Sequence, residues 1–264
     1  MTNITVTHTQ SGVVHAHVVR REQITPHMVR LTLGGDDLRR FEYRGFDQWF
    51  RLAVPVDDNA EFDRLPDRVD MRGYLRYLML PKATRPVLRN YTVRQFRPDG
   101  PELDIDFVVH GDEGIAAPWA RRAEPGTEVA FIDQGCGYAP VPADWQLLVG
   151  DESALPAIAG ILRDMPRDCV GHAIVELPDA ADAQPVDAPV GMRVQWLARP
   201  PGAAPGATAI AAVQALERPP GDVYAFAVGE SSLATGVRRW LVRDLGVDKS
   251  RVTFCGYWRR GRAQ

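Results

Sequence analysis

The chain has 264 residues, which suits one large domain or two of ordinary size, and its 45% hydrophobic and 25% charged residues are normal for a globular protein. The formal net charge of -3 argues against nucleic acid as the main partner. The three cysteines, Cys136, Cys169 and Cys255, form no CxxC pair, so neither a disulfide framework nor an iron–sulfur or zinc site is indicated.

No apolar run approaches the roughly 20 residues that are needed to span a bilayer. The first residues, MTNITVTHTQ, lack a basic segment followed by an apolar one, as a secretory signal would have. We therefore expect a cytoplasmic protein without stable membrane insertion. His15 and His17 share one face of a strand, but no third ligand lies near them in the sequence, and we predict no metal site.

The first half of the chain is predicted to be rich in β-strands. Runs with alternating apolar residues cover 13–21, 27–35, 49–56, 89–96, 102–111 and 127–135. We expect a charged loop after the third run, continuing through Arg72, and a short helix over 114–123. Many short strands separated by turns favour a small antiparallel β-barrel.

After residue 145 the pattern changes to strands that alternate with helices. Strands are expected in QLLVGD, HAIVELP, MRVQWLARP, DVYAFAVGE and SRVTFCGYW, with helices in ALPAIAGILRDMP, ATAIAAVQALERP and SSLATGVRRWLVRDLG. This alternation predicts a parallel α/β sheet. We place a β-barrel domain at 1–141 and an α/β domain at 142–264.

The α/β half contains neither GxGxxG nor the P-loop pattern. Instead, GDESALPA (150–157) and GESS (229–232) each follow a strand and open a helix. Ligands bind at the carboxyl ends of strands in open α/β sheets, and helix N-termini attract anions. The two segments are therefore either anion-binding loops or ordinary strand-to-helix turns.

The run RNYTVR (89–94) raises a similar choice in the barrel half. Because a strand alternates its faces, Arg89 and Tyr91 share one side and Thr92 lies on the other. Arg89 and Tyr91 form either a structural cross-strand pair or the seat of a flat, phosphate-bearing cofactor. Strict alternation lets Tyr91 and Thr92 touch one ring only if the ring sits at the end or edge of the strand.

Six segments together resemble the siderophore-interacting proteins, or ferric-siderophore reductases, within the ferredoxin-reductase-type flavoproteins. The segments are RNYTVR (89–94), DIDFVVHG (104–111), GDESALPAI (150–158), VELPDAAD (175–182), AVGESS (227–232) and GYWRRG (256–261). They span nearly the whole chain in the order of the family. The resemblance implies an FAD-binding β-barrel followed by an α/β domain for NADH or NADPH.

The resemblance also implies which residues bind FAD. Arg89 would hold the pyrophosphate, Tyr91 would stack on the isoalloxazine, and Thr92 would lie near N5, so that Tyr91 and Thr92 serve catalysis. The complete implied FAD set is Arg89, Asn90, Tyr91, Thr92, Asp106, Val108, Val109, His110, Gly114, Ala116, Ala117 and Trp119. Related flavoproteins often carry Ser or Thr where this chain has Ala116 and Ala117, so backbone N–H groups would have to bind the phosphate there.

For the nucleotide and the substrate, the resemblance implies two further sets. The NAD(P)H set is Gly150, Asp151, Glu152, Ser153, Gly229, Glu230 and Ser231. The substrate set is Arg51, Arg259 and Arg260, which would attract an anionic ferric siderophore. The choice between NADH and NADPH stays open, because Asp179 and Asp182 favour the former while Arg193 and Arg199 favour the latter.

The expected activity is an FAD-dependent ferric-siderophore reductase, in which electrons pass from NAD(P)H, or from ferredoxin, through the flavin to Fe(III) and free iron as Fe(II). Siderophore oxygens suit Fe(III) far better than Fe(II). Two alternatives remain, a general NAD(P)H:flavin or diaphorase-type reductase and a non-enzymatic siderophore-binding protein. We expect a monomer.

Overall fold

The computed structural model describes the chain except residues 1, 8–10, 57–59, 69, 110–113 and 262–264. The chain forms two compact units. The barrel unit comprises Val6–Arg44 and Gln48–Cys136, and the α/β unit comprises Met1–Thr5, Gly45–Asp47 and Gly137–Gln264. The single boundary between residues 141 and 142 stays a prediction of domain organisation.

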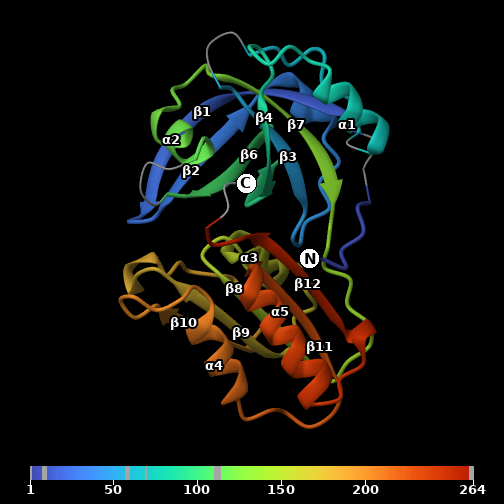
Figure 1. The fold of residues 1–264 in the computed structure, drawn as a ribbon, viewed down its shortest axis with the longest axis vertical. Coiled ribbons are helices and arrows are strands. Elements are labelled where there is room, and N and C mark those ends of the chain that lie inside the picture. The colour runs from blue at the N-terminus through green and yellow to red at the C-terminus, as the bar shows by residue number, and fades with distance from the viewer. Residues whose placement is uncertain (1, 8–10, 57–59, 69, 110–113, 262–264) are drawn as a thin grey trace. The chain divides into compact units, whose positions relative to one another are not determined.

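The barrel unit is built on a seven-stranded antiparallel sheet (Figure 1). Its strands are β1 (Val13–Thr25), β2 (Met28–Gly34), β3 (Trp49–Val54), β4 (Val87–Thr92), β5 (Gln95–Arg97), β6 (Glu102–Val108) and β7 (Glu128–Gly135). Its helices are α1 (Met71–Leu78), α2 (Ala116–Arg122) and the 3-10 helix η1 (Asp36–Arg40). The predicted helix near 114–123 is confirmed, and so are the predicted strands except 89–96. The predicted loop through Arg72 is wrong at its end, because Met71 and Arg72 begin α1.

Closure of this sheet depends on one continuous segment, Val87–Arg97. The strand order is β4-β3-β7-β1-β2-β6-β5, so β4 and β5 lie at opposite ends of the sheet although only two residues separate them. At this break, Val93 N donates to Gln48 O at 2.8 Å and Arg94 N donates to Asp104 O at 2.9 Å. The predicted strand 89–96 is therefore two strands, which join both edges of the sheet and close the expected barrel.

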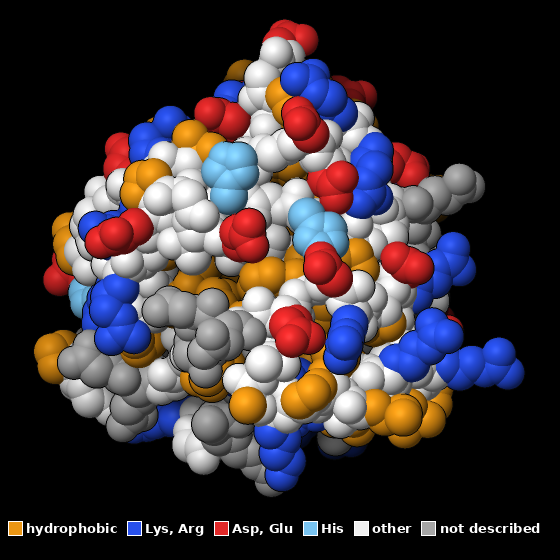
Figure 2. Space-filling model, turned by 90° about the horizontal axis from the view of Figure 1, so that it is seen from above, with side chains coloured by type: hydrophobic (Ala, Val, Ile, Leu, Met, Phe, Trp, Pro, Cys, Tyr) orange, Lys and Arg blue, Asp and Glu red, His pale blue; other side chains and the backbone are white. Residues whose placement is uncertain are grey.

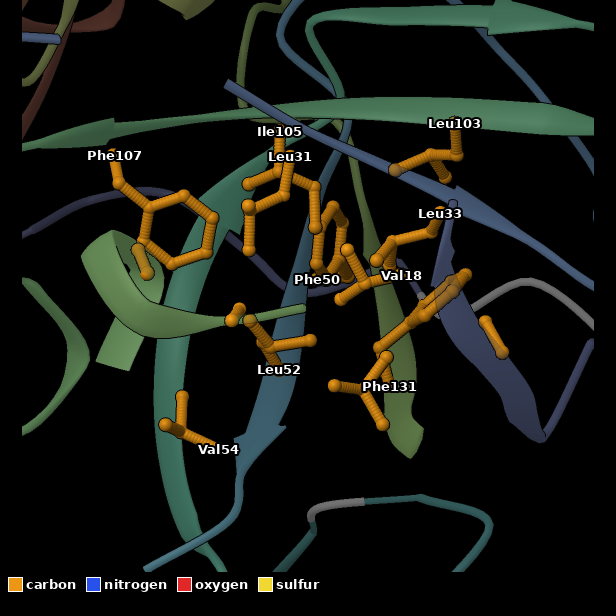
Figure 3. Close-up of a cluster of buried hydrophobic side chains, with 14 of the residues drawn as sticks. Val18, Leu31, Leu33, Phe50, Leu52, Val54, Leu103, Ile105, Phe107 and Phe131 are labelled. Atoms are coloured by element: carbon orange, nitrogen blue, oxygen red, sulfur yellow. The ribbon is translucent and has the colours of Figure 1, made fainter. Parts of the chain in front are cut away.

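The interior of the barrel is filled by alternate side chains of its strands. Figure 3 shows ten of them converging: Val18, Leu31, Leu33, Phe50, Leu52, Val54, Leu103, Ile105, Phe107 and Phe131. All ten are fully buried. Burying each side chain contributes about 1.5–3 kcal/mol, so this core fixes the register of the strands that carry RNYTVR.

The α/β unit has a five-stranded parallel sheet with the order β10-β9-β8-β11-β12. Its strands are β8 (Trp145–Asp151), β9 (Val170–Leu177), β10 (Gly191–Ala198), β11 (Val223–Glu230) and β12 (Val252–Trp258). Its helices are α3 (Leu155–Asp164), α4 (Ala207–Gln214) and α5 (Ser231–Arg239), with the short turns η2 (Ala180–Asp182), η3 (Trp240–Asp244, a π-helix) and η4 (Lys249–Arg251). The predicted parallel α/β sheet is confirmed.

Helices cover both faces of this sheet (Figure 1). On one face, Leu155 and Ile158 of α3 pack with Phe226 of β11. On the other face, Val213 of α4 and Leu233 of α5 join a second cluster. The carboxyl ends of the parallel strands lie along one edge, where α3 and α5 begin, and this edge carries both GDESALPA and GESS.

Three features are absent from the described residues. No helix in the described part of the chain is long and apolar enough to cross a membrane. No group of three or more His, Cys, Asp or Glu side chains among those residues is arranged to hold a metal ion. No disulfide joins any two of Cys136, Cys169 and Cys255, all of which lie in the described part of the chain.

Candidate functional site

The two faces of β4 carry different parts of RNYTVR. In the pairing with β3, Tyr91 is opposite Phe50 and Thr92 is opposite Trp49. Tyr91 packs against the barrel core that contains Phe50, while Thr92 points to the other face and is buried there. Strict alternation therefore holds. Since β4 is the last strand of the sheet and ends at Thr92, the edge position required for both side chains to reach one ring is present.

Tyr91 belongs to a row of three aromatic rings. The centroids of Tyr91 and Phe107 are 4.3 Å apart with their planes tilted by 45°, and those of Phe107 and Trp119 are 5.7 Å apart at 59°. Phe107 is fully buried, whereas Tyr91 and Trp119 are half-buried at its two sides. Burial raises the pKa of Tyr91, with partial relief from Arg89, so the phenol stays neutral at physiological pH. Because the rings are tilted and Phe107 is fully buried, the half-buried rings of Tyr91 and Trp119 are the parts of the row that can contact a flat ring system.

Arg89 is a half-buried cation with no counter-ion among the described residues. Its Nη1 donates to Leu88 O at 2.9 Å, and no described carboxylate lies within ion-pair distance of the guanidinium. Burial lowers the pKa of Arg89, although the neighbouring Tyr91 and Tyr77 oppose this effect. A desolvated guanidinium gains from an anion that can accept several of its five N–H groups, and a pyrophosphate is such an anion. The residues therefore fit FAD.

The turn before α2 and the helix start supply further members of the predicted FAD set. Val108 is half-buried at the end of β6 and Val109 is buried, while His110 lies outside the described residues. Ala116 and Ala117 are half-buried and pack against the barrel core beside Trp119. Gly114 is exposed, and a Cβ atom there would meet no atom within 4 Å, which leaves space at this turn. The structure thus brings Ala116, Ala117 and Trp119 to the aromatic row.

Asp106 has a structural task in the barrel. Its buried carboxylate pairs with Arg30 at 2.6 Å and with Arg94 at 3.4 Å. Nearby, Arg97 pairs with Asp104 at 2.7 Å and with Glu102 at 2.8 Å. This ladder joins β2, β6 and β5. A contact between Asp106 and FAD stays a prediction, and the ion pairs account for the burial of this carboxylate without it.

Trp49 and Arg51 leave buried donors unsatisfied. Both side chains are half-buried on β3, and neither Trp49 Nε1 nor Arg51 Nε has a hydrogen-bond partner among the described residues. Burial lowers the pKa of Arg51 and the nearby Tyr74 raises it. In the register of the sheet, Arg51 is opposite Asn90, which is exposed. A cation with an unpartnered N–H group beside an exposed amide has the chemistry to bind an anion.

In the α/β unit, the carboxylate of Asp151 is fully hydrogen-bonded within the protein. Its carboxylate is fully buried and accepts hydrogen bonds from Ser153 N at 3.0 Å, Ser153 Oγ at 2.5 Å, Glu230 N at 2.6 Å and Trp258 Nε1 at 2.8 Å. Burial raises the pKa of Asp151, and these donors oppose the shift. Asp151 therefore ties the ends of β8, β11 and β12 together.

Glu152 is held by Arg199, which also pairs with Glu176. The Arg199–Glu152 distance is 2.8 Å and the Arg199–Glu176 distance is 2.6 Å. Burial raises the pKa of Glu152 to about 7, the charge of Asp151 adds to the rise, and Arg199 opposes it. Glu176 also accepts N–H groups at the start of α4, from Gly206 at 2.8 Å and Thr208 at 2.9 Å. Arg199 is thus engaged by two carboxylates.

The N-termini of α3 and α5 differ in what occupies them. Glu230 caps α5, because its carboxylate accepts from Ser232 N and from Leu233 N, the latter at 3.3 Å. Ser231 Oγ donates to Trp258 O at 2.9 Å. No side chain caps α3, whose N-cap is Ala154. Of these two helices, only α3 has no side-chain acceptor at its start, where Leu155 and Ala157 carry N–H groups and Pro156 has none.

The remaining predicted residues of the α/β unit are also placed. Gly150 is buried near the end of β8, and Gly229 lies against Asp151. Asp179 and Asp182 form a reciprocal capping box around η2, so both carboxylates bind their own turn. Arg259 and Arg260 are exposed after β12, and Arg260 N donates to Glu230 Oε1 at 3.3 Å. The predicted NAD(P)H set is therefore assembled at one edge of the sheet.

Sequence reasoning missed several contacts of these sites, and it expected Arg199 to favour NADPH, whereas Arg199 pairs with Glu152 and Glu176. Phe107, the centre of the aromatic row, sits in DIDFVVHG at the alternate positions that point inward, and that periodicity was the available signal. Arg199 and Glu176 form a long-range ion pair with no local signature. Trp258 binds Asp151 across 107 positions of the chain, which only the parallel sheet reveals.

Both halves of the chain match known family models. Residues 17–136 match the siderophore-interacting FAD-binding domain, and residues 143–261 match siderophore-interacting protein. Ferric vibriobactin reductase ViuB of Vibrio cholerae is 33% identical over 92% of this chain and 88% of that protein. The NADPH-dependent ferric-chelate reductase of Escherichia coli is 31% identical over 91% of each chain.

Solved structures agree with these matches. A siderophore utilization protein from T. fusca is similar with a TM-score of 0.80 and 34% identity, over 98% of this chain and 97% of that one. The ferredoxin reductase of carbazole 1,9a-dioxygenase shares the fold, with a TM-score of 0.65 and 17% identity over 93% of this chain and 69% of that one. The fold is thus ferredoxin-reductase-like, as expected. The chain belongs to the siderophore-interacting protein family.

Proposed function

We propose that this protein is an FAD-dependent ferric-siderophore reductase. The observation that carries the proposal is the pairing of an uncompensated half-buried cation, Arg89, with the aromatic row of Tyr91, Phe107 and Trp119. One part suits a pyrophosphate and the other suits a flat ring system. They occur in the half of the chain that matches an FAD-binding family model.

In this proposal the residues of the barrel unit bind and orient FAD. Arg89 holds the pyrophosphate, and Tyr91 presents its neutral ring to the isoalloxazine. Thr92, at the end of the edge strand, offers a hydroxyl to the reactive nitrogen. Asn90, Val108, Val109, His110, Gly114, Ala116 and Ala117 complete the predicted contacts. When bound, FAD supplies the chemistry that accepts a hydride and releases single electrons.

The iron balance follows from the electron count. One hydride carries two electrons, so each NAD(P)H reduces two Fe(III) ions to Fe(II). The siderophore keeps Fe(II) less tightly because its hard oxygen ligands favour the higher charge. We assign Arg51, Arg259 and Arg260 to steering the anionic ferric chelate. The unmet Nε donor of Arg51 supports that assignment.

For the electron donor, we propose NAD(P)H at the loop that opens α3. The first N–H groups of α3 have no side-chain cap, and Gly150, Asp151, Glu152 and Ser153 form the loop before them. At α5, the carboxylate of Glu230 already accepts the first N–H groups of the helix, so no anion is proposed to bind there. Gly229, Glu230 and Ser231 instead form the neighbouring part of the sheet edge. The related enzyme of Escherichia coli is described as NADPH-dependent. Ferredoxin is the competing donor.

One anaerobic experiment tests the proposal. The FAD-loaded protein is reduced in turn with NADH, NADPH and reduced ferredoxin, then mixed with ferric siderophores, and Fe(II) is trapped with a ferrous chelator. We expect flavin reoxidation and trapped Fe(II) in a ratio of two iron ions per FAD. If no donor yields trapped Fe(II), the proposal fails.

Two other results would point to the alternatives. Turnover of free flavin without retained FAD would identify a general flavin reductase, and a colourless protein that binds ferric siderophore would identify a binding protein. The proposal also includes a cytoplasmic location and a monomeric state. Cell fractionation and light scattering measure these two properties directly.

A further inference from the structure

Helix α1 is attached to the barrel by one narrow face. Gly73 is buried, and Tyr77 and Leu80 pack against an outer cluster that includes Phe62 and Leu65. Tyr77 also donates its hydroxyl to Pro86 O at 3.0 Å. Asp70 starts the helix by accepting from Gly73 N at 2.7 Å. The spacing of 73, 77 and 80 defines the inner face of the helix.

The outer face of α1 is apolar and open to solvent. Met71, Tyr74, Leu75 and Leu78 follow the spacing i, i+3, i+4, i+7, and Met79 continues the row. Their exposed fractions are 76%, 45%, 54%, 44% and 84%. We call these five residues the α1 stripe. Most large apolar side chains of this protein are buried, and five of the exposed ones in the described part of the chain gather within nine residues here. Such a patch marks an interaction surface.

The α1 stripe lies in a segment that carries only positive charge. Between Asp70 and Asp99 the sequence has no acidic residue, but it has seven cations: Arg72, Arg76, Lys82, Arg85, Arg89, Arg94 and Arg97. Arg72, Arg76 and Lys82 are exposed, and none of the three pairs with a described carboxylate. Figure 2 shows apolar and cationic side chains side by side near the lower right edge of that view.

Shape and charge together select the partner. Side chains that are roughly half or more exposed form a protruding ridge, whereas small molecules bind in concave sites. A short helix with an apolar stripe, flanked by Arg and Lys, is the pattern of helices that lie in the membrane–water interface. Unpaired Arg and Lys side chains suit a headgroup layer, because its phosphates have no fixed positions. We propose that the α1 stripe, with Arg72, Arg76 and Lys82, docks this protein on an anionic lipid surface.

Vesicle sedimentation of the full-length, FAD-loaded protein tests the proposal. We expect the protein to sediment with vesicles of phosphatidylglycerol mixed with phosphatidylcholine, and to stay in the supernatant with phosphatidylcholine alone. Binding to the anionic vesicles should weaken at high salt. The double variant Leu75→Asp/Leu78→Asp should bind these vesicles at least about tenfold more weakly, because two apolar side chains no longer enter the interface.

Two matched variants separate the apolar and the charge contributions. Val190→Asp adds a charge at a fully exposed valine of the α/β unit and should sediment like the wild type. Arg72→Gln/Arg76→Gln keeps the stripe and should lose the preference for anionic vesicles. Retained FAD absorbance and an unchanged thermal transition show that each variant is folded.

Two results would overturn the proposal. Equal sedimentation of the wild type and Leu75→Asp/Leu78→Asp would show that the stripe does not contact lipid. A wild-type dimer in light scattering that becomes monomeric in the same variant, without vesicle binding by either, would assign the stripe to a second copy of the chain. Reduction of a ferric siderophore in solution should not change in this variant, so the test is independent of the proposed activity.

Discussion

Trp258 donates its indole Nε1–H to the buried carboxylate of Asp151 at 2.8 Å, across the carboxyl ends of two strands that are not neighbours in the sheet. Between them lies β11, whose Glu230 N donates to the same carboxylate at 2.6 Å. One side chain therefore ties three strand ends together. The motif GDE therefore has a structural role in addition to its proposed role at the start of a nucleotide-binding loop.

This clasp leaves no room for a side chain at Gly229. Its φ is +120°, and a Cβ atom there would lie 2.7 Å from the carboxyl carbon of Asp151. We expect Gly229→Ala to lower the free energy of unfolding by roughly 2–5 kcal/mol, from backbone strain and overpacking together. Chemical denaturation followed by tryptophan fluorescence measures the change.

Gly246 provides the matched control for this substitution. It also has a positive φ, +70°, but a Cβ atom there would meet nothing within 4 Å. Gly246→Ala should therefore cost only the backbone term, about 1–2 kcal/mol. Equal losses in the two variants would mean that contact with Asp151 is unimportant.

The pKa of Glu152 predicts a pH dependence of stability in the α/β unit. Burial, and then the charge of Asp151, raise that pKa from 4.5 to about 7. A raised pKa means that the folded protein holds the proton more tightly than the unfolded chain, so this stabilisation is present at low pH. It is lost as the pH rises from about 4.5 through about 7.

Comparison with Glu152→Gln isolates this effect. The difference in unfolding free energy between the wild type and Glu152→Gln should fall by roughly 3 kcal/mol across that interval. Hydrogen bonds and arginine partners lower the pKa values of Asp37 and Asp104, although burial opposes this. These two groups therefore add stability as the pH rises at lower pH. Their contribution is the same in both proteins, so it drops out of the difference between the wild type and Glu152→Gln. Parallel stability curves for the two proteins would refute the assignment.

Removal of Arg89 or Tyr91 should release FAD without unfolding the barrel. Loss of a charge-assisted contact of about 1.5–3 kcal/mol corresponds to roughly 10- to 150-fold weaker binding in Arg89→Ala. Tyr91→Ala should also lose FAD because the ring seat is incomplete. The ratio of flavin to protein absorbance after gel filtration measures retention.

Arg39 is the control for these variants. It is an exposed arginine of the same unit, 3.6 Å from Asp36, and Arg39→Ala should retain FAD. Stoichiometric FAD in both Arg89→Ala and Tyr91→Ala would remove the site assignment. Far-UV circular dichroism checks that each variant keeps its fold.

Phe107 should matter for FAD through the rings that it supports. Phe107→Leu keeps an apolar side chain in the core, so its cost in stability should stay below about 1.5 kcal/mol. Without the central ring, Tyr91 and Trp119 lose their support, and FAD affinity should fall by roughly 3- to 10-fold. Phe131→Leu, in the same core but outside the aromatic row, should cost similar stability and leave FAD binding unchanged.

The sequence carried most of the fold because its strands alternate and its helices are amphipathic. Where the prediction from the sequence was wrong, tertiary contacts determine the structure. The run 89–96 looks like one strand, but Val93 and Arg94 bend it between two sheet edges, and only barrel closure requires that bend. Helix α1 was not predicted, because its apolar residues face solvent while a glycine and a tyrosine face the protein.

The parts of the candidate site that lie within one short segment could be predicted from the sequence. Contacts between residues that are far apart in the sequence could not. Arg89, Tyr91 and Thr92 lie within four residues of one strand, and alternation alone gives their faces. The self-capping of α5 by Glu230 reverses the simple expectation that this helix start is an empty anion site. Propensity does not distinguish a glutamate that binds its own helix from one that faces a ligand.

The segment Val87–Arg97 closes the barrel and also carries Arg89, Tyr91 and Thr92, the residues that we propose to hold FAD. Saturation with FAD and integrity of this seam are then thermodynamically linked, and free FAD above its dissociation constant stabilises the closed barrel in proportion to the logarithm of its concentration. In hydrogen exchange, the amides of Val93 and Arg94 should be the reporters, since both donate across the seam. We expect these two amides to exchange faster in the FAD-free protein than in the FAD-loaded protein.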